Sequence, residues 1–188
     1  MNKKILIFGY GSLISTKGWN LTLKRTISKK DLNYTIVNNY VRTWTAMSKV
    51  YFNNSKDVQI ALFLDLTKNI NSQINGYSLE VTKEEFKNIT KREKGYEMIN
   101  ITSNVEKPLA NSTYYAAIVN QNEKCTDFSK AFIPQKYYDF VENAVKESFS
   151  EVQKKLFIKN IIQPKELQFK NESYKFFDDE INRNTSDY

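Results

Sequence analysis

Apolar residues follow two spacings along this chain, one typical of strands and one typical of helices. Short runs with β-branched or aromatic residues at alternate positions favour strands. These runs predict about six strands, at residues 3–8, 33–43, 58–66, 73–81, 96–105 and 112–119. We expect an irregularity in the second strand at Asn38-Asn39, and we expect the polar stretch Thr67–Ser72 to separate the third strand from the fourth.

One helix has a clear start signal after the fourth predicted strand. Thr82 and Glu85 form a capping-box pattern, in which the side chain of each residue accepts a hydrogen bond from the backbone N–H of the other. This pattern predicts a helix that runs to about Arg92. Phe86 and Ile89 lie three residues apart on one face of it, so we expect both to pack against the sheet.

The remaining helices are predicted from the spacing of apolar residues. Pro134 suits the first turn of a helix. The apolar residues that continue this helix are Tyr137, Tyr138, Val141, Ala144, Val145 and Phe149. We expect a shorter helix at residues 150–159 and another around Trp19–Lys24.

The order of these elements predicts an α+β fold with one main domain. Strands cluster early, one helix interrupts them and two helices come late, which differs from a βαβ alternation. We place the domain at residues 1–164. From residue 165 onward the apolar periodicity is lost, so we expect residues 165–188 to form a C-terminal tail that is partly mobile at its end.

The composition favours a packed core and excludes several kinds of catalytic site. Of the 188 residues 40% are apolar, and 12 are Tyr and 12 are Phe, which argues against disorder. The chain has no histidine and Cys125 is its single cysteine. Ser-His-Asp and Cys-His sites, His-ligated or Cys-rich metal sites and disulfides are therefore excluded. Any acid–base chemistry must come from Asp, Glu, Tyr or Lys.

The net charge of +7 raises the question of an acidic partner. The lysines are scattered, so we interpret the charge as a solvated basic surface and expect no nucleic-acid partner. Tyr40, Arg42 and Trp44 alternate and would share one face of a strand. Three interpretations of this patch are open: a sheet face that lines a pocket or the core, a surface that stacks on single-stranded nucleic acid, or an Arg42 that pairs with a substrate carboxylate.

The N-terminal apolar run is too short for a secretory signal. Only four apolar residues separate Lys4 from Gly9, and no later segment approaches the length of a membrane span. We expect a soluble cytoplasmic protein without a membrane partner.

The residues FGYGSLI at 8–14 follow directly on the first predicted strand and are suited to ligand binding. Gly9 and Gly11 tolerate a positive φ and carry no side chain that would block a ligand. Successive N–H groups in such a turn can converge on an anionic or carbonyl oxygen.

The loop Tyr10-Gly11-Ser12-Leu13, taken together with Arg92-Glu93 and Gly95-Tyr96, resembles the γ-glutamylcyclotransferase-like family. Members carry a YGS loop after the first strand and a catalytic Glu at a helix end shortly before a Tyr. A weaker match is Pro134 with Tyr138 four residues later. The similarity spans roughly residues 5–150. The late helix departs from the family by having Ala144-Val145 where a glycine is expected.

The resemblance implies a fold, an activity and a site. The fold is a small, mixed and partly closed β-barrel flanked by helices. The activity is cyclisation of a γ-glutamyl group to 5-oxoproline with release of an amine or amino acid, without metal or organic cofactor. Glu93 would be the catalytic acid and base. The residues that would bind the small γ-glutamyl substrate are Gly9, Tyr10, Gly11, Ser12, Leu13, Tyr96 and Tyr138, with Tyr137 as an alternative to Tyr138.

Other interpretations of these residues stay open. Glu93 lies among Lys91, Arg92 and Lys94, a setting that also suits a solvated ion-pair partner. An enzyme on this fold could be specific for glutathione or for γ-glutamyl-lysine-type amides. The alternatives outside catalysis are a ligand-binding or interaction module on the same fold and a basic RNA-binding protein.

Overall fold

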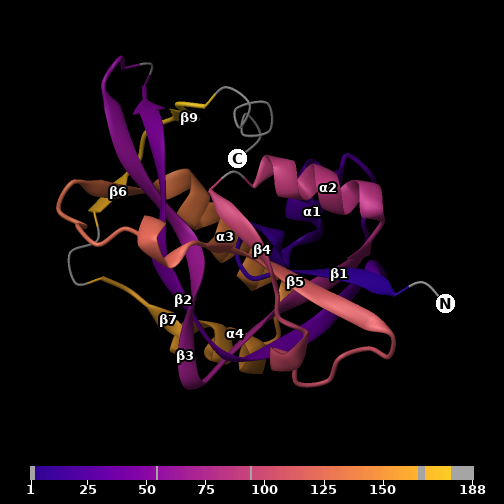
Figure 1. Cartoon of the computed structure of the whole chain (residues 1–188). Coiled ribbons are helices and arrows are strands. Elements are labelled where there is room, and N and C mark those ends of the chain that lie inside the picture. The colour runs from indigo at the N-terminus through magenta and orange to yellow at the C-terminus, as the bar shows by residue number, and fades with distance from the viewer. Residues whose placement is uncertain (1–2, 54, 94, 165–167, 179–188) are drawn as a thin grey trace.

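Two long antiparallel strands, β2 (Leu32–Phe52) and β3 (Val58–Val81), pair along most of their length and dominate the architecture (Figure 1). The computed structural model describes residues 3–53, 55–93, 95–164 and 168–178. The pairing shifts register between Asn38 and Tyr40, and Asn39 has a φ of 64°, so the predicted irregularity at Asn38-Asn39 is confirmed.

The prediction that Thr67–Ser72 separates two strands is wrong. β3 runs through this stretch as one strand of 24 residues. Lys68 pairs with Tyr40 and Gln73 pairs with Asn38, whereas residues 69–72 between them pair with no residue of β2 and Asn71 has a φ of 68°, so the strand carries an exposed bulge here. The polarity of this stretch reflects an exposed bulge within one strand rather than a loop between two strands.

The first strand lies in the middle of the sheet. β1 (Lys4–Gly9) pairs antiparallel with β3 on one side and parallel with β5 (Ser112–Val119) on the other. β4 (Tyr96–Asn100) pairs antiparallel with β5 at the edge. The strand predicted at 96–105 ends at Asn100, because the Asn100 side chain accepts the N–H of Thr102 at 3.0 Å and starts a turn.

Short strands from the last third of the chain complete the sheet. β6 (Ala131–Pro134) pairs with β3 and with β8 (Gln168–Lys170). β7 (Ile161–Ile162) and β9 (Tyr174–Phe176) pair with β2. The described residues thus form nine strands instead of about six. Residues 168–176 of the predicted tail take part in the sheet, whereas the end expected to be mobile lies outside the described residues.

Four α-helices are present in the described part of the chain. They are α1 (Thr16–Leu23), α2 (Lys83–Arg92), α3 (Gln135–Ser148) and α4 (Glu151–Lys159). The capping box of α2 is confirmed, since Thr82 N–H donates to Glu85 Oε2 at 2.8 Å and Glu85 N–H donates to Thr82 Oγ1 at 3.1 Å. Ser150 and Gln153 form a second capping box at α4.

Two apolar clusters bury β1 on both faces. Leu6 and Phe8 belong to the larger cluster, which includes side chains from α3, and Ile7 belongs to a smaller one with Trp19 and Ile89 from α1 and α2. Burial on both sides fixes the end of β1. The molecule is a mixed α/β fold built on one large mixed sheet; the partial closure of that sheet into a barrel stays a prediction.

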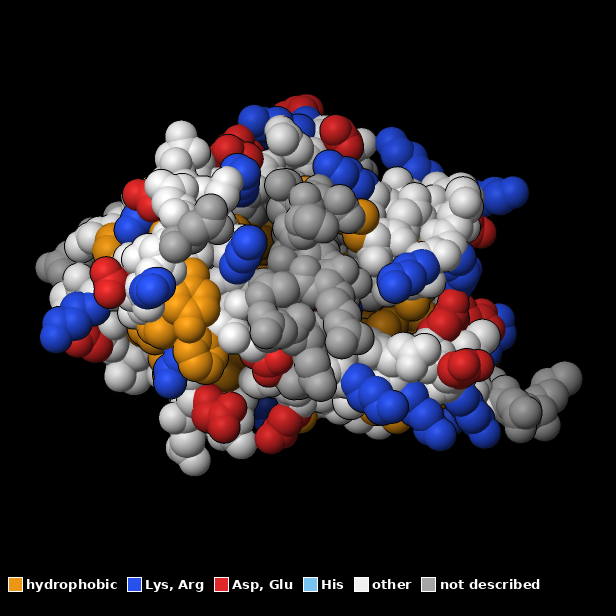
Figure 2. All heavy atoms as spheres, turned by 90° about the horizontal axis from the view of Figure 1, so that it is seen from above, with side chains coloured by type: hydrophobic (Ala, Val, Ile, Leu, Met, Phe, Trp, Pro, Cys, Tyr) orange, Lys and Arg blue, Asp and Glu red, His pale blue; other side chains and the backbone are white. Residues whose placement is uncertain are grey.

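The surface is charged but its charges are mixed. Figure 2 shows basic side chains interspersed with acidic ones over one face of the molecule. Among the described residues, no helix is long and apolar enough to cross a membrane.

A buried ion pair ties β3 to the segment after β5. Lys124 Nζ lies 2.7 Å from Asp65 Oδ2, and both side chains are almost entirely excluded from solvent. Asp65 Oδ1 also accepts the N–H of Val119 at 3.0 Å, and Lys124 also donates to the Leu66 carbonyl at 2.7 Å. Removing one partner would leave the other charge buried and unpaired.

We expect Lys124→Met to lower the free energy of unfolding by about 3–5 kcal/mol, because it leaves the Asp65 carboxylate buried without a cation. The matched control is Lys4→Met, since Lys4 pairs with Glu80 at 2.8 Å in a half-exposed setting and should cost about 0–1 kcal/mol. Denaturant unfolding measures both values. Equal losses in the two variants would contradict a structural role for the buried pair.

Candidate active site

The end of β1 and the loop that follows it require glycine because the backbone folds back closely on itself. A Cβ on Gly9 would lie 2.3 Å from the Leu13 carbonyl oxygen, and a Cβ on Gly76 would lie 2.2 Å from the Gly9 carbonyl oxygen. Gly95 has a positive φ, whereas Gly9 and Gly11 do not. Gly9 and Gly11 therefore do not use the positive φ that glycine tolerates, and close backbone approach explains Gly9.

The side chain of Tyr10 points inward and anchors the loop to the sheet. Its hydroxyl donates to the Ala117 carbonyl of β5 at 2.6 Å. Burial, with smaller contributions from Tyr96 and Asp65, raises the pKa of Tyr10 well above its ordinary value. Tyr10 is therefore a neutral hydrogen-bond donor that holds the loop in place.

Arg42 holds the same loop from beneath. Its side chain is fully buried, and Nε donates to the Tyr10 carbonyl at 2.9 Å while Nη2 donates to the Asn75 carbonyl. The guanidinium lies 4.1 Å from the ring centre of Phe157. Burial lowers the pKa of Arg42 to about 9, so the group stays charged at neutral pH.

The structure decides between the interpretations of the Tyr40, Arg42 and Trp44 patch. All three side chains are buried. Arg42 is not part of the cleft described below, so its predicted pairing with a substrate carboxylate is wrong. Buried rings cannot stack on bases, so this patch is also not a surface for nucleic acid; it is a sheet face in the core.

The loop and Glu93 line one cleft, although about eighty residues separate them in the sequence. The volume of this cleft is about 60 Å³. The predicted site residues that line it are Gly9, Tyr10, Gly11, Ser12, Leu13, Glu93 and Tyr96. The sequence motifs therefore meet in space.

Glu93 reaches the cleft from the C-terminal end of α2. Its N–H closes the helix by donating to the Ile89 carbonyl at 2.9 Å, and its carbonyl accepts the N–H of Tyr96 at 3.0 Å. Glu93 is partly exposed at the cleft. Burial raises the pKa of its carboxyl, and the nearby Arg92 lowers it by a smaller amount. A carboxyl with a raised pKa is suited to taking up and returning a proton near neutral pH.

The loop that lines the cleft also carries backbone N–H groups without a partner in the described part of the chain. Ser12–Ile14 forms a short 3-10 helix whose first N–H groups have no partner inside the helix. Within the described ranges, the N–H groups of Ser12 and Leu13 donate to no other residue, whereas Ile14 N–H donates to the Gly11 carbonyl at 3.1 Å. Unpaired N–H groups of this kind can bind an anionic or carbonyl oxygen.

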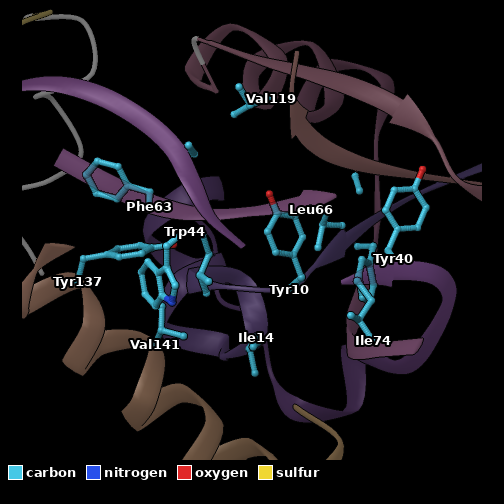
Figure 3. Close-up of a cluster of buried hydrophobic side chains, with 14 of the residues drawn as sticks. Tyr10, Ile14, Tyr40, Trp44, Phe63, Leu66, Ile74, Val119, Tyr137 and Val141 are labelled. Carbon is cyan, nitrogen blue, oxygen red and sulfur yellow. The ribbon is translucent and has the colours of Figure 1, made fainter. Parts of the chain in front are cut away.

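The two adjacent tyrosines of α3 lie in different places. Tyr137 lines the cleft, and its hydroxyl lies 3.1 Å from the position that a Cβ on Gly11 would take. Tyr138 does not line the cleft; it stacks on Trp44 with ring centres 5.9 Å apart. Figure 3 shows Tyr137 beside Trp44. The structure thus corrects the predicted position of Tyr138, and Tyr137, the alternative, is the tyrosine at the cleft.

Several apolar residues complete the walls of the cleft. Phe8 belongs to the FGYGSLI segment, whereas the sequence motifs did not identify Ile7, Leu64, Ile89, Met98 and Ala117. Their positions depend on the pairing of β1, β3, β4 and β5, which no local pattern specifies. Among the described residues, no group of three or more Asp, Glu or Cys side chains lies close enough together to hold a metal ion.

Comparison with known proteins gives a match in structure. No family model and no curated protein matches the sequence. A solved structure titled "Gamma-glutamyl cyclotransferase" is similar with a TM-score of 0.58 and 14% identity, over 87% of this chain and 91% of that one. An uncharacterized human protein is similar with a TM-score of 0.53 and 16% identity, over 90% of this chain and 95% of that one.

A third similar structure, YkqA from Bacillus subtilis, has a TM-score of 0.52 and 14% identity, over 83% of this chain and 53% of that one. Identities this low carry information about the fold alone. The chain has a γ-glutamyl cyclotransferase-like fold.

Proposed function

We propose that this protein is a γ-glutamyl cyclotransferase-type enzyme. The observation that carries the proposal is that Glu93 and the Tyr10–Leu13 loop line the same cleft. The fold shared with the solved γ-glutamyl cyclotransferase supports it. The substrate would be a γ-glutamyl amine, amino acid or peptide, and the products would be 5-oxoproline and the released amine.

The reaction suits a chain without histidine. The α-amine of the γ-glutamyl group attacks its own γ-carbonyl carbon, so a C–N bond forms within the substrate and the bond to the departing amine breaks. Ring closure is unimolecular, and binding the substrate in a folded conformer can remove up to about 7–11 kcal/mol of the barrier. The protein therefore needs no nucleophile of its own.

Two proton transfers remain, and one carboxyl can carry out both. Glu93 would take the proton that the α-ammonium loses and return it to the departing amine. The raised pKa of Glu93 helps the return step, because the protonated carboxyl persists closer to neutral pH. The attacking nitrogen passes from an ammonium to the lactam N–H and so loses two protons: Glu93 carries one to the departing nitrogen, which leaves as a neutral amine, and the other is released to solvent.

The loop would bind the charged parts of the substrate. The N–H groups of Ser12 and Leu13 would donate to the α-carboxylate or to the developing oxyanion, a role that their lack of a partner among the described residues supports. Removal of one such donor typically raises a barrier by about 2.7–4 kcal/mol. Tyr96 and Tyr137 would form the side walls. Specificity for glutathione or for a γ-glutamyl-lysine-type amide would come from the part of the pocket that receives the departing amine.

We expect Glu93→Gln to lower turnover by about 10²–10⁴-fold, because it removes the proton carrier. Release of 5-oxoproline from a panel of γ-glutamyl compounds, including glutathione, measures this. Glu97→Gln is the matched control: Glu97 is exposed on β4 and accepts a hydrogen bond from Asn120 at 3.2 Å, so its loss should leave activity unchanged. Equal activity in the parent and Glu93→Gln would refute the assignment.

The pH dependence follows from the raised pKa of Glu93. Activity should rise with pH along a limb that lies above 4.5, the ordinary pKa of a glutamate carboxyl, because attack needs the ionised form. A pH–rate profile with 5-oxoproline as the readout tests this. If activity rises with pH at or below the ordinary pKa of a glutamate carboxyl, burial does not raise the pKa of Glu93.

The raised pKa of Glu93 also makes the free energy of unfolding depend on pH. Well below pH 4.5 Glu93 is protonated in both the folded and the unfolded chain. As pH rises through the raised pKa, the folded state holds on to a proton that the unfolded state has lost, so the free energy of unfolding of the parent falls. In Glu93→Gln the free energy of unfolding does not fall in this way as pH rises. Its Tm should match the parent at low pH and equal or exceed it at neutral pH, and a Tm that falls behind the parent as pH rises would contradict a raised pKa at Glu93.

Arg42 is expected to act as a positioning residue for the loop. Lysine cannot reach both the Tyr10 and Asn75 carbonyls in one plane while stacking on Phe157. We expect Arg42→Lys to lower kcat with little change in KM, measured well below its Tm. The control is Arg25→Lys, because Arg25 forms an exposed pair with Glu85. If Arg42→Lys has a lower Tm than the parent but the same kcat, Arg42 contributes to stability alone.

A further inference from the structure

A second cavity lies between α3, α4 and the long strands, separate from the cleft. Its volume is about 530 Å³, within the range of roughly 300–1,000 Å³ that is usual for small-molecule sites. The wall is mostly apolar and includes Trp44, Val141, Val145 and Phe157. The cleft and the cavity share Leu64 in their walls, but the loop and Glu93 contribute nothing to the cavity.

One buried polar atom in this wall has no partner. The Trp44 side chain is 2% exposed, and its indole Nε1 has no hydrogen-bond partner in the part of the chain that the structure describes. Figure 3 shows this nitrogen on the side of Val141, which also lines the cavity. Leaving a buried N–H unpaired costs free energy. A ligand oxygen that reached this nitrogen would accept its hydrogen bond.

The polar part of the lining favours an anion. Lys146 and Lys154 line the cavity together with one acidic residue, Glu142. Lys146 pairs with Glu142 at 2.7 Å, and Lys154 pairs with Glu151 at 2.8 Å, but the Glu151 side chain is 81% exposed. Ion pairs with such exposed carboxylates are weak, so both ammonium groups remain able to bind a ligand carboxylate.

We propose that this cavity binds a small, free amphipathic anion. The apolar body of the ligand lies against Val141, Val145 and Phe157, its carboxylate pairs with Lys146 and Lys154, and an inner oxygen accepts the hydrogen bond of Trp44 Nε1. A medium-chain hydroxy acid has this chemistry. The proposal does not depend on the cyclotransferase reaction, and Glu93→Gln should bind such a ligand as the parent does.

Isothermal titration of the full chain with medium-chain carboxylic acids and their matched alcohols tests the charge requirement. We expect one molecule of acid bound per chain and weaker binding of the alcohol. Lys154→Gln should weaken binding of the acid about threefold, as expected for one partly exposed charge contact. Lys155→Gln is the matched control, since Lys155 is the next residue on α4 but does not line the cavity. Equal effects of the two substitutions would overturn the proposal.

Two further variants test the inner contact and the location. Medium-chain ω-hydroxy acids should bind more tightly than the unsubstituted acids, and Trp44→Phe should remove that preference. Ile158→Trp places a large ring at the wall of the cavity from a residue that is 69% exposed, so the fold should persist while binding is lost. Unchanged binding in Ile158→Trp would overturn the location. The ligand is proposed to be a free molecule and not a membrane lipid. If the protein sediments with anionic phospholipid vesicles, and neither Trp44→Phe nor Ile158→Trp prevents this, that part of the proposal is overturned.

Discussion

The buried guanidinium of Arg42 is the constraint on which the candidate site depends. A cation without solvent is costly unless hydrogen bonds compensate it, and here the compensation comes from the Tyr10 and Asn75 carbonyls and the face of Phe157. These contacts join the loop after β1 to β2, β3 and α4. Since the Gly9 carbonyl also packs against Gly76, the loop has little freedom to move relative to the sheet. The loop that lines the cleft is thereby held in a fixed arrangement.

Much of the fold followed from local patterns, and the rest depended on pairing that no local pattern records. The strand at 112–119 and the capped helix that ends at Arg92 were predicted correctly, because alternation and the Thr82–Glu85 pair act within a few residues. The continuity of β3 could not be predicted because its exposed and mostly polar bulge at residues 69–72 has the composition of a loop. The strands β6 to β9 have two to four residues each and exist through their partners, so their own sequence carries almost no signal.

The residues of the candidate site could be predicted where a sequence motif identifies them. They could not be predicted where their position depends on how the elements pack. The motifs identified the loop and Glu93, and the structure brings both to one cleft. Tyr137 and Tyr138 differ by about 100° around a helix, so the orientation of α3, set by the core, decided which tyrosine faces the cleft. Arg42 alternates with two aromatic residues in the sequence, and only its burial shows that it supports the loop instead of meeting a ligand.

A cleft that serves the proposed reaction must hold a γ-glutamyl group between the loop and Glu93. A crystal structure of the Glu93→Gln variant with a bound γ-glutamyl compound would show this directly. We predict the α-amine within hydrogen-bond distance of the side chain at position 93, and the α-carboxylate or the γ-carbonyl oxygen at the N–H groups of Ser12 and Leu13. A ligand bound elsewhere with the cleft unoccupied, or a γ-carbonyl that faces away from both groups, would contradict the proposed function.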